Sequence, residues 1–274
     1  WNGYNEAMLV YILALASPTH PVGVDAYKAW SSSYDKTWGE FQGQEHLSFP
    51  PLFGHQYSQV WLDLRGVQDD YMRGQGIDYF ENSRRAVHSQ RAYAIANPQD
   101  WAGYGKDMWG LTASDGPIDA TYVYKGQPRV FRTYAARGAG SEYILDDGTI
   151  APTAAVASLP FAPEIVIPAV IEMHDRYGQH IYRKYGFIDA FNPSFHYDVS
   201  LNQGKVVAGM GWVDDDYIGI DQGPIVLMIE NHRSEFVWNV MRGNPHLRRG
   251  LERAGFTGGW LDDAGAAPTA APPQ

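Results

Sequence analysis

Residues 3–13 read GYNEAMLVYIL and residues 220–229 read IDQGPIVLMI, and these two distant stretches follow one pattern. Each carries an acidic residue at its start, Glu6 or Asp221, and continues into a run that is apolar almost all round. A helix that is apolar on every side is typical of a protein interior. We therefore predict two buried helices. If the two helices run in the same direction, their acidic residues should lie close together at one end of the helices.

The composition narrows the classes of protein to consider. The 274 residues include 31 acidic and 21 basic side chains without a long Lys/Arg cluster, so a nucleic-acid partner is not expected. No apolar run reaches the roughly 18 to 20 residues that span a bilayer. The absence of Cys excludes disulfides, thiolate metal sites and a cysteine nucleophile in this chain. Nine Trp and eighteen Tyr, many beside Gly, Asn, Asp or Gln, suit binding of sugars, although aromatic residues are also ordinary core material.

Proline, glycine and capping residues divide the chain into helices joined by long loops. Asp78 and Glu81 form a capping-box-like helix start, and Asn97-Pro98 marks the end of the same helix. We expect one hairpin around Lys125-Gly126 in a loop-rich middle region, 99–160, and a Gly/Pro-rich loop over 35–51 that covers a site. Seven or eight helices and few strands indicate an inner ring of helices packed inside an outer ring. The predicted helices cover 3–16, 22–33, 55–65, 78–96, 161–177, 220–232, 234–242 and 245–254.

The residue patterns of several common active sites do not occur in this sequence. Nine His residues show neither HExxH spacing nor a cluster, so we expect no bound catalytic metal. The nucleophile pattern Gly-x-Ser-x-Gly is absent, and so is the phosphate-binding pattern Gly-x-x-x-x-Gly-Lys. Carboxylates remain as the candidate catalytic groups.

Glu6 and Asp221 are the carboxylates that we favour as a catalytic pair. Glycoside hydrolysis needs one carboxylic acid and one carboxylate, about 5 Å apart for retention and roughly 6.5 to 9.5 Å apart for inversion. The start of a helix stabilises a charged acid, which suits Asp221 as an ionised base. Glu6 would need burial to stay protonated as the acid. The residues alone also allow a plainer interpretation, in which both acids simply begin helices.

Several longer motifs, in consistent order, resemble a known family. They are WNGYNEAM (1–8), SPTHP (17–21), WLDLRG (61–66), YFENSR (79–84), WGLTASDGP (109–117), DDGTIAPTAA (146–155), PFAPE (160–164) and IDQGP (220–224). Together they resemble the bacterial glucoamylase-like family, which includes the endo-β-1,2-glucanases of glycoside hydrolase family 144, over nearly the whole chain. The resemblance implies an all-α (α/α)6 toroid whose inner helices begin at the substrate cleft. It also implies inverting, metal-independent hydrolysis of β-1,2-linked glucan or a related β-glucan, without a cofactor.

The resemblance further implies roles for individual residues. Glu6 is expected to be the general acid and Asp221 the general base. A structural role is the alternative for every other candidate: Arg65 could pair with Asp63 or Asp69, and Glu81 fits a helix cap. The candidates for binding or stacking on the sugar are Tyr4, Asn5, His55, Asp63, Arg65, Glu81, Trp109, Asp115, Arg137, Asp147 and Gln222.

A complete toroid of this kind needs more residues than the chain has, so the sequence is expected to be the C-terminal portion of the family domain. We predict the catalytic portion over 1–258 and a flexible Ala/Pro-rich tail over 259–274. The missing N-terminal helices would be removed, absent or on a second chain that completes the barrel. The resemblance suggests a periplasmic or secreted bacterial protein, with no leader visible. A transglycosylase, a non-catalytic glycan-binding or sensing module and an α-glucan hydrolase remain alternatives.

Overall fold

A computed structural model of the chain describes residues 2–263, and helices predominate in this range. Two short 3-10 helices, η1 (Tyr34–Lys36) and η2 (Gly259–Leu261), accompany the α-helices. The α-helices of the described residues are α1 (Ala7–Ala16), α2 (Asp25–Ser31), α3 (Phe53–Trp61), α4 (Asp70–Gln75), α5 (Tyr79–Ala96), α6 (Pro152–Val156), α7 (Pro163–Ile181), α8 (Gly219–Ser234), α9 (Phe236–Arg242) and α10 (Pro245–Arg253).

Short antiparallel strands form small sheets between the helices. The pairs are β1 with β2, β3 with β6, β4 with β5, β7 with β8 and β9 with β10, while β13 lies between β11 and β12. The strands are β1 (Trp38–Phe41), β2 (Gln44–Leu47), β3 (Ala113–Asp115), β4 (Ala120–Tyr124), β5 (Gln127–Phe131), β6 (Tyr134–Ala136), β7 (Gly138–Ala139), β8 (Ile144–Leu145), β9 (Tyr182–Arg183), β10 (Gly186–Phe187), β11 (Phe191–Asn192), β12 (Lys205–Val207) and β13 (Gly211–Val213).

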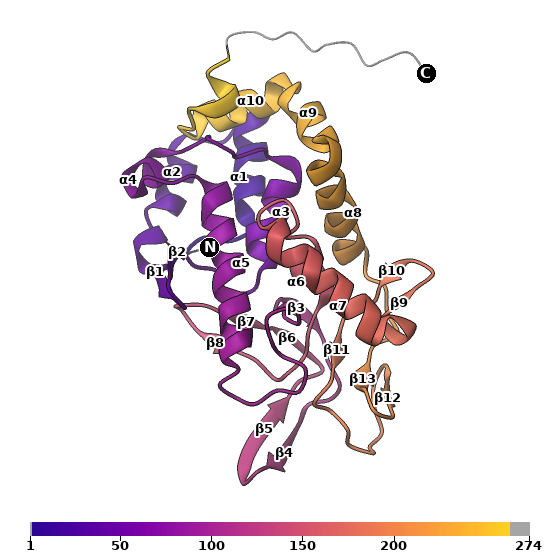
Figure 1. Ribbon diagram of the computed structural model, residues 1–274. Coiled ribbons are helices and arrows are strands. Elements are labelled where there is room, and N and C mark those ends of the chain that lie inside the picture. The colour runs from indigo at the N-terminus through magenta and orange to yellow at the C-terminus, as the bar shows by residue number, and fades with distance from the viewer. Residues whose placement is uncertain (1, 264–274) are drawn as a thin grey trace.

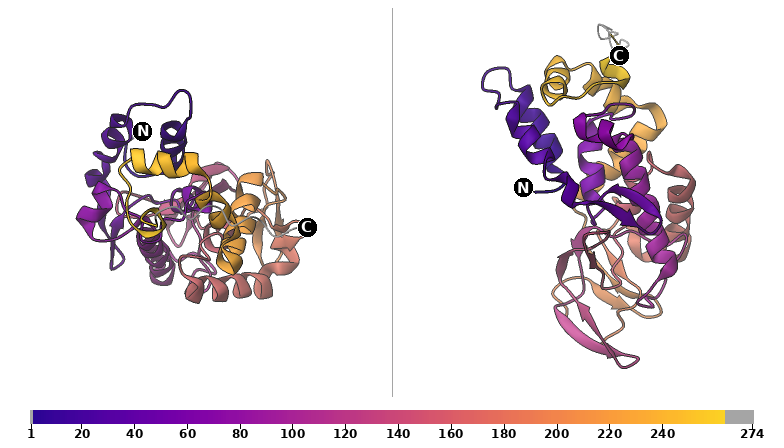
Figure 2. Two further views of the ribbon diagram at one scale, coloured as in Figure 1. Left: turned by 90° about the horizontal axis from the view of Figure 1, so that it is seen from above. Right: turned by 90° about the vertical axis from the view of Figure 1, so that its left-hand side faces the viewer.

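Helices and strands occupy different ends of the molecule. In Figure 1 the helices α1, α2, α4, α9 and α10 lie in the upper part, while most of the short strands lie in the lower part. The side view in Figure 2 shows the same separation. The described chain is therefore mostly helical with small strand hairpins, as the family resemblance implies at this coarser level.

Local sequence signals explain the best-predicted elements. The carboxylate of Asp78 accepts the Glu81 N–H at 2.7 Å, and Asn97 ends α5 in the left-handed conformation with φ of 41°. The predicted helix over 78–96 is thereby confirmed almost to the residue. The hairpin at Lys125-Gly126 is also confirmed, because both residues have positive φ, 49° and 78°, as a tight two-residue turn requires.

Two predictions need correction. The segment 35–51, expected to be a loop, contains the β1/β2 hairpin, which turns at Gln42 and Gly43 with φ of 52° and 77°. A Gln-Gly pair is a weaker turn signal than Asn-Gly, so the sequence did not reveal it. The tail predicted to be flexible from residue 259 is ordered at its start, because η2 lies there and the Trp260 indole donates to the Asp63 carbonyl at 2.8 Å. The remainder of the predicted tail, 264–274, lies outside the described residues.

The helix α3 joins the two largest of the four clusters of buried apolar residues in the described chain, which we call the two halves of the core. One half includes Met8 and Ile12 of α1, and the other includes Ile225 and Met228 of α8. The helix α3 packs against both α1 and α8. The starts of α1 and α8 are consequently held in a fixed relation, although more than 200 residues separate them.

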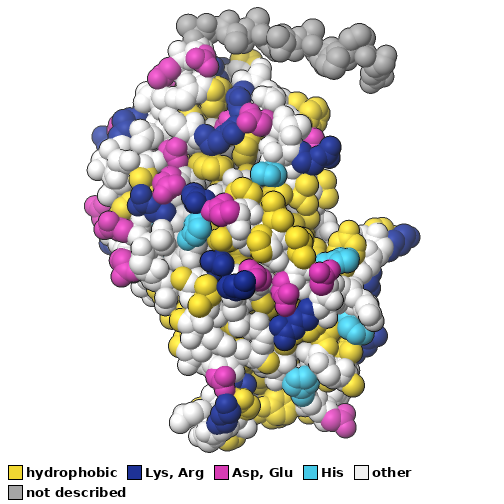
Figure 3. Space-filling model, viewed as in Figure 1, with side chains coloured by type: hydrophobic (Ala, Val, Ile, Leu, Met, Phe, Trp, Pro, Cys, Tyr) yellow, Lys and Arg dark blue, Asp and Glu magenta, His cyan; other side chains and the backbone are white. Residues whose placement is uncertain are grey.

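Apolar side chains are also exposed on one face of the molecule. In Figure 3 they gather over α7, α8 and α9. The exposed apolar residues of these helices are Ile167, Ile171, Ile220, Val226, Phe236 and Val240. Among residues 2–263, the helices all fall short of the length and apolarity that crossing a bilayer would require.

Candidate active site

Glu6 and Asp221 line one cavity of about 440 Å³. Glu6 directly precedes α1 and Asp221 lies in the first turn of α8, so the N-terminal ends of these two helices meet at the cavity. Strands β3 and β6 form part of the opposite wall. The structure thus brings together the two acids that the sequence pattern singled out, at the junction of the helical and strand-rich ends.

Hydrogen bonds link α3 to the two helices that carry the acids. The Ser58 hydroxyl of α3 accepts the Leu9 N–H and donates to the carbonyl of Glu6, both at 3.2 Å. At the other side of α3, the Asn231 amide of α8 donates to the Val60 carbonyl at 2.9 Å. These polar contacts in a packed interior hold the start of α1 and the C-terminal part of α8 against α3.

The carboxyl group of Glu6 does not cap α1, because the neighbouring Asn5 does so. Asn5, rather than Glu6, accepts the Ala7 N–H, at 2.9 Å, and so serves the start of α1. The Oε2 atom of Glu6 is buried and has no hydrogen-bond partner among the described residues. A carboxyl oxygen without a partner, at the wall of a cavity, is available to bind or protonate a ligand atom.

Asp221 lies against a second aspartate that the sequence did not identify. Asp221 is 4% exposed, and its carboxyl group is within hydrogen-bonding contact of the Asp189 carboxyl group, which also lines the cavity. Burial raises the pKa of both residues, and the neighbouring Asp221 raises the pKa of Asp189 further. The hydrogen bond from Asp189 acts in the opposite direction on Asp221, whose pKa it lowers.

Asp115 and Asp214 extend this pair into a group that we call the carboxyl cluster, Asp115, Asp189, Asp214 and Asp221. Oxygens of Asp115, Asp189 and Asp214 lie within 4.8 Å of one another. Asp189 Oδ2 accepts the Asp115 N–H at 2.8 Å, and Asp214 Oδ1 accepts the Asp215 N–H at 2.7 Å. Burial raises the pKa of Asp214 to about 7. Peptide N–H groups engage Asp189 Oδ2 and Asp214 Oδ1, whereas Asp214 Oδ2 is buried without a hydrogen-bond partner among the described residues.

The other walls of the cavity are largely apolar. Phe49 and Phe53 line it, together with Tyr134 and Ile220, whose exposed fractions are 63% and 50%. Aromatic rings beside carboxyl groups suit the C–H faces and hydroxyl edges of a sugar. The cavity therefore combines acid–base groups with surfaces that can stack on a carbohydrate.

Three predicted substrate-binding residues lie in the hydrophobic core. Tyr4 stacks on Tyr79 with ring centroids 5.6 Å apart, and His55 lies 5.2 Å from the Tyr4 ring. Burial lowers the pKa of His55 to about 3, so this imidazole is neutral. Trp109 is 1% exposed and packs in the other half of the core. None of the three lines the cavity.

Three further candidates form ion pairs elsewhere on the molecule. Arg65 pairs with Asp63 at 2.8 Å and with Glu235 at 2.8 Å, which is the structural role left open for it. Asp63 also binds Arg242. Glu81 pairs with Arg85 at 2.9 Å on the surface of α5. These charges are satisfied within the chain and lie outside the cavity wall.

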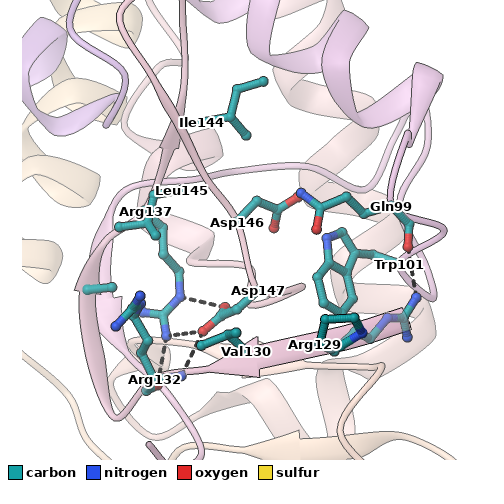
Figure 4. Close-up of a pocket in the computed structure, with 12 residues that line it drawn as sticks. Gln99, Trp101, Arg129, Val130, Arg132, Arg137, Ile144, Leu145, Asp146 and Asp147 are labelled. Atoms are coloured by element: carbon teal, nitrogen blue, oxygen red, sulfur yellow. Dashed lines mark hydrogen bonds and ion pairs between the residues drawn. The ribbon is translucent and has the colours of Figure 1, made fainter. Parts of the chain in front are cut away.

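Arg137 and Asp147 form a buried ion pair, and they point toward each other in Figure 4. The Arg137 Nε–Asp147 Oδ1 distance is 2.7 Å, and a second nitrogen of Arg137 donates to Oδ2 at 2.8 Å. Arg137 also donates to the Ser114 carbonyl at 2.6 Å, and Ser114 lines the cavity that Glu6 and Asp221 share. The pair therefore supports the cavity wall from behind.

The remaining two candidates lie next to Glu6 and Asp221 in the chain. Gln222 follows Asp221 and donates to the Phe187 carbonyl at 2.7 Å, which anchors the first turn of α8. Asn5 precedes Glu6 and serves the start of α1 as described above. Of the thirteen residues predicted for the site, Glu6 and Asp221 line the cavity, and Asp115 belongs to the carboxyl cluster beside it.

Comparison with known proteins identifies the family. The family described as "Putative glucoamylase" matches residues 1–245 of the chain. The chain belongs to this glucoamylase family. An endo-β-1,2-glucanase from Chitinophaga pinensis, solved with sophorotriose and glucose, is 34% identical with a TM-score of 0.74, covering 95% of this chain and 56% of that one. A solved family member from Bacteroides uniformis is 35% identical with a TM-score of 0.76 and the same coverage of both chains.

A further relative in the glucoamylase family is longer still. An exo-β-1,2-glucooligosaccharide sophorohydrolase from Parabacteroides distasonis is 30% identical over an alignment of 275 positions, which covers 92% of this chain and 33% of that protein. The chain thus spans about half the length of the two solved family members and a third of the sophorohydrolase.

Sequence reasoning missed several residues of this family member's cavity. Asp189 at the cavity and Asp214 beside it lie in segments for which no helix was predicted, and pairing of β11 with β13 brings these segments together. The row Asp214-Asp215-Asp216 was the one available signal, because consecutive acids in a glycine-rich segment are unusual. Phe49, Phe53 and Tyr134 carried no signal that separates them from ordinary core aromatics.

Proposed function

We propose that this chain carries the general acid and base of a glycoside hydrolase that cleaves β-1,2-linked glucan. The observation that carries the proposal is the meeting of Glu6 and Asp221, from two distant helix starts, at one cavity. Each has a buried carboxyl oxygen without a hydrogen-bond donor among the described residues. The names of two relatives, an endo-β-1,2-glucanase and a β-1,2-glucooligosaccharide sophorohydrolase, support the substrate class.

The proposed reaction inverts the configuration of the anomeric carbon. Glu6 gives its proton to the glycosidic oxygen, while Asp221 takes a proton from a water molecule that attacks the opposite face of the sugar. Asp221 must be ionised for this step, so the rate should fall at low pH. Because burial raises its pKa, the fall should begin above the ordinary carboxyl range of about 4. Two carboxyl groups suffice for these proton transfers, and the proposed reaction uses no cofactor.

For the complete protein we propose an (α/α)6 toroid, of which this chain forms the C-terminal portion. The solved family members are longer than the chain, which covers 56% of two of them. Exposed apolar residues on α1, Val10 and Leu13, and on α7, Ile167 and Ile171, offer surfaces that further helices could cover. A periplasmic or secreted location is part of this proposal and rests on the family resemblance.

The test compares wild type, Glu6→Gln and Asp221→Asn in the full-length protein. Each is incubated with β-1,2-glucan, starch and β-1,3-glucan, and the anomers of the products are resolved by NMR. We expect wild type to release α-anomers from β-1,2-glucan, and both variants to lose about 10²- to 10⁴-fold in kcat. Glu81→Gln is the matched control, since Glu81 pairs with Arg85 away from the cavity.

Three outcomes would contradict parts of the proposal. Full activity in both variants would remove Glu6 and Asp221 from the mechanism. Tight binding of glucan without turnover by wild type would indicate a glycan-binding module. Products longer than the substrate would indicate transfer to a sugar hydroxyl in place of hydrolysis.

A further inference from the structure

Asp189 occupies an unusual position beside the proposed catalytic base. It lies between β10 and β11, is 1% exposed, and lines the same cavity as Glu6 and Asp221. Its backbone is fixed, because the Asp189 N–H donates to the Asp216 carbonyl at 3.1 Å. One of its carboxyl oxygens, Oδ2, accepts the Asp115 N–H at 2.8 Å. The side chain is thus held in one orientation, with its carboxyl group in contact with that of Asp221.

Two carboxyl groups in hydrogen-bonding contact need a proton between them, because neither carboxylate can donate. A nearby cation could replace the proton, but none of the four residues of the carboxyl cluster forms an ion pair within residues 2–263. Arg137 approaches closest, donating to the backbone carbonyl of Asp115 at 3.2 Å, and its charge is neutralised by Asp147. A shared proton is therefore the simplest way to satisfy the pair.

The surroundings decide which partner holds the proton. The carboxylates of Asp115 and Asp214 lie near the pair, from β3 and from the segment after β13, and disfavour a negative charge on Asp189 and on Asp221 alike, so they favour a proton in the pair without deciding its place. Asp221, unlike Asp189, lies in the first turn of α8, where the peptide N–H groups favour a negative charge. Glu6 faces the same cavity from the start of α1. The proton accordingly belongs on Asp189 and the charge on Asp221.

We propose that Asp189 is a positioning residue for the general base: its protonated carboxyl group donates a hydrogen bond to Asp221, which aims and ionises the Asp221 carboxylate. This inference rests on the proposed function. During turnover, the water oxygen bonds to the anomeric carbon and its proton moves to Asp221, while the Glu6 proton moves to the leaving oxygen. The proton of Asp189 remains in the pair throughout, so the overall reaction consumes one water and no other reactant.

Asp189→Asn and Asp189→Ala separate positioning from simple structural support. Asparagine keeps a donor toward Asp221 and an acceptor for the Asp115 N–H, whereas alanine removes both. We expect Asp189→Ala to lower kcat about 10- to 100-fold with KM little changed, and Asp189→Asn to restore most of kcat. The low-pH limb of the kcat profile should move to higher pH in Asp189→Ala and stay near its wild-type position in Asp189→Asn. Asp215→Asn, at an exposed neighbour outside the cluster, is the control.

A spectroscopic measurement keeps this test independent of the proposed function. Because Asp214 is also largely protonated at pH 6, infrared difference spectra of the substrate-free protein at this pH should show more than one protonated carboxyl C=O band. The band of Asp189 should be lost in Asp189→Asn and kept in Asp214→Asn and Asp215→Asn. If wild type shows this band but hydrolyses no glucan, the proposed function fails while the proton-sharing pair stands.

Two results would overturn the inference. One is a kcat profile whose low-pH limb is unmoved in Asp189→Ala, which would make Asp189 a structural residue only. The other is loss of the Asp189 carboxyl band when Ca²⁺ is added to chelator-treated protein, together with a gain in kcat. In that case a cation, and not a proton, would neutralise the Asp189–Asp221 pair.

Discussion

Replacing Arg137 with Met should destabilise the protein by about 3 kcal/mol, at the lower end of the cost of breaking a buried ion pair. Arg137 and Asp147 have side chains only 1% and 4% exposed, so water cannot replace the lost partner. Asp147 would keep the N–H groups of Arg132 and Thr149, at 3.1 and 3.2 Å, and these reduce the penalty for its unpaired charge. Met fills a similar volume, which limits the cost of a cavity.

The assay is urea unfolding at pH 7, followed by tryptophan fluorescence. Arg85→Met is the matched control, because the Arg85–Glu81 pair has the same chemistry with side chains 29% and 42% exposed, and should change the free energy of unfolding by less than about 1 kcal/mol. The double variant Arg137→Met, Asp147→Leu should recover part of the loss, since no buried charge remains.

A loss in Arg137→Met no larger than that in Arg85→Met would refute this reasoning. A second measurement, KM, distinguishes this structural role of Arg137 from the sugar-binding role that the family resemblance implies. If Arg137 bound sugar, Arg137→Met would raise KM with little effect on the free energy of unfolding. If Arg137 instead acts through its ion pair, Arg137→Met should lower the free energy of unfolding with little effect on KM. The same change should loosen Ser114 at the cavity wall.

Three further predictions concern stability alone. Asp78→Ala should lower the free energy of unfolding in urea by about 1 to 2 kcal/mol, because Asp78 caps α5 and also accepts the Gly66 N–H at 2.7 Å. The control is Asp70→Ala, which should change this free energy little because the Asp70 side chain is exposed. Gly138→Ala should cost about 1 to 3 kcal/mol, since its Cβ would lie 2.3 Å from the Pro50 carbonyl carbon, while Gly74→Ala has open space in α4 and should be neutral or stabilising. Finally, burial raises the pKa of Asp214 to about 7, so the folded state binds a proton that the unfolded state releases near pH 4. The free energy of unfolding should therefore fall as pH rises from about 4 through about 7, and Asp214→Asn should flatten that fall.

Short-range signals made much of the helical framework predictable. The Asp78 cap and the Asn97 stop define α5, and two residues of positive φ define the β4/β5 turn, because these features depend on neighbours within a few positions. The β1/β2 hairpin was missed for the same reason, since Gln42-Gly43 is a weak local signal. The (α/α)6 arrangement stays a prediction, and so does the assignment of residues 1–258 to a catalytic portion of a longer domain.

The sequence by itself determined that Glu6 and Asp221 each stand at the start of a mostly apolar helix, because this depends on the order of residues along the chain. The predicted burial on every side was wrong for the described chain, since Val10, Leu13 and Val226 are exposed. Only the tertiary structure decided that both acids face one cavity, because this depends on α3 packing between α1 and α8. It also decided that Tyr4, His55 and Trp109 are core residues and that Asp189 lies against Asp221. Contacts between residues far apart in the chain follow from the packing of whole elements, and the sequence near each residue carries no record of them.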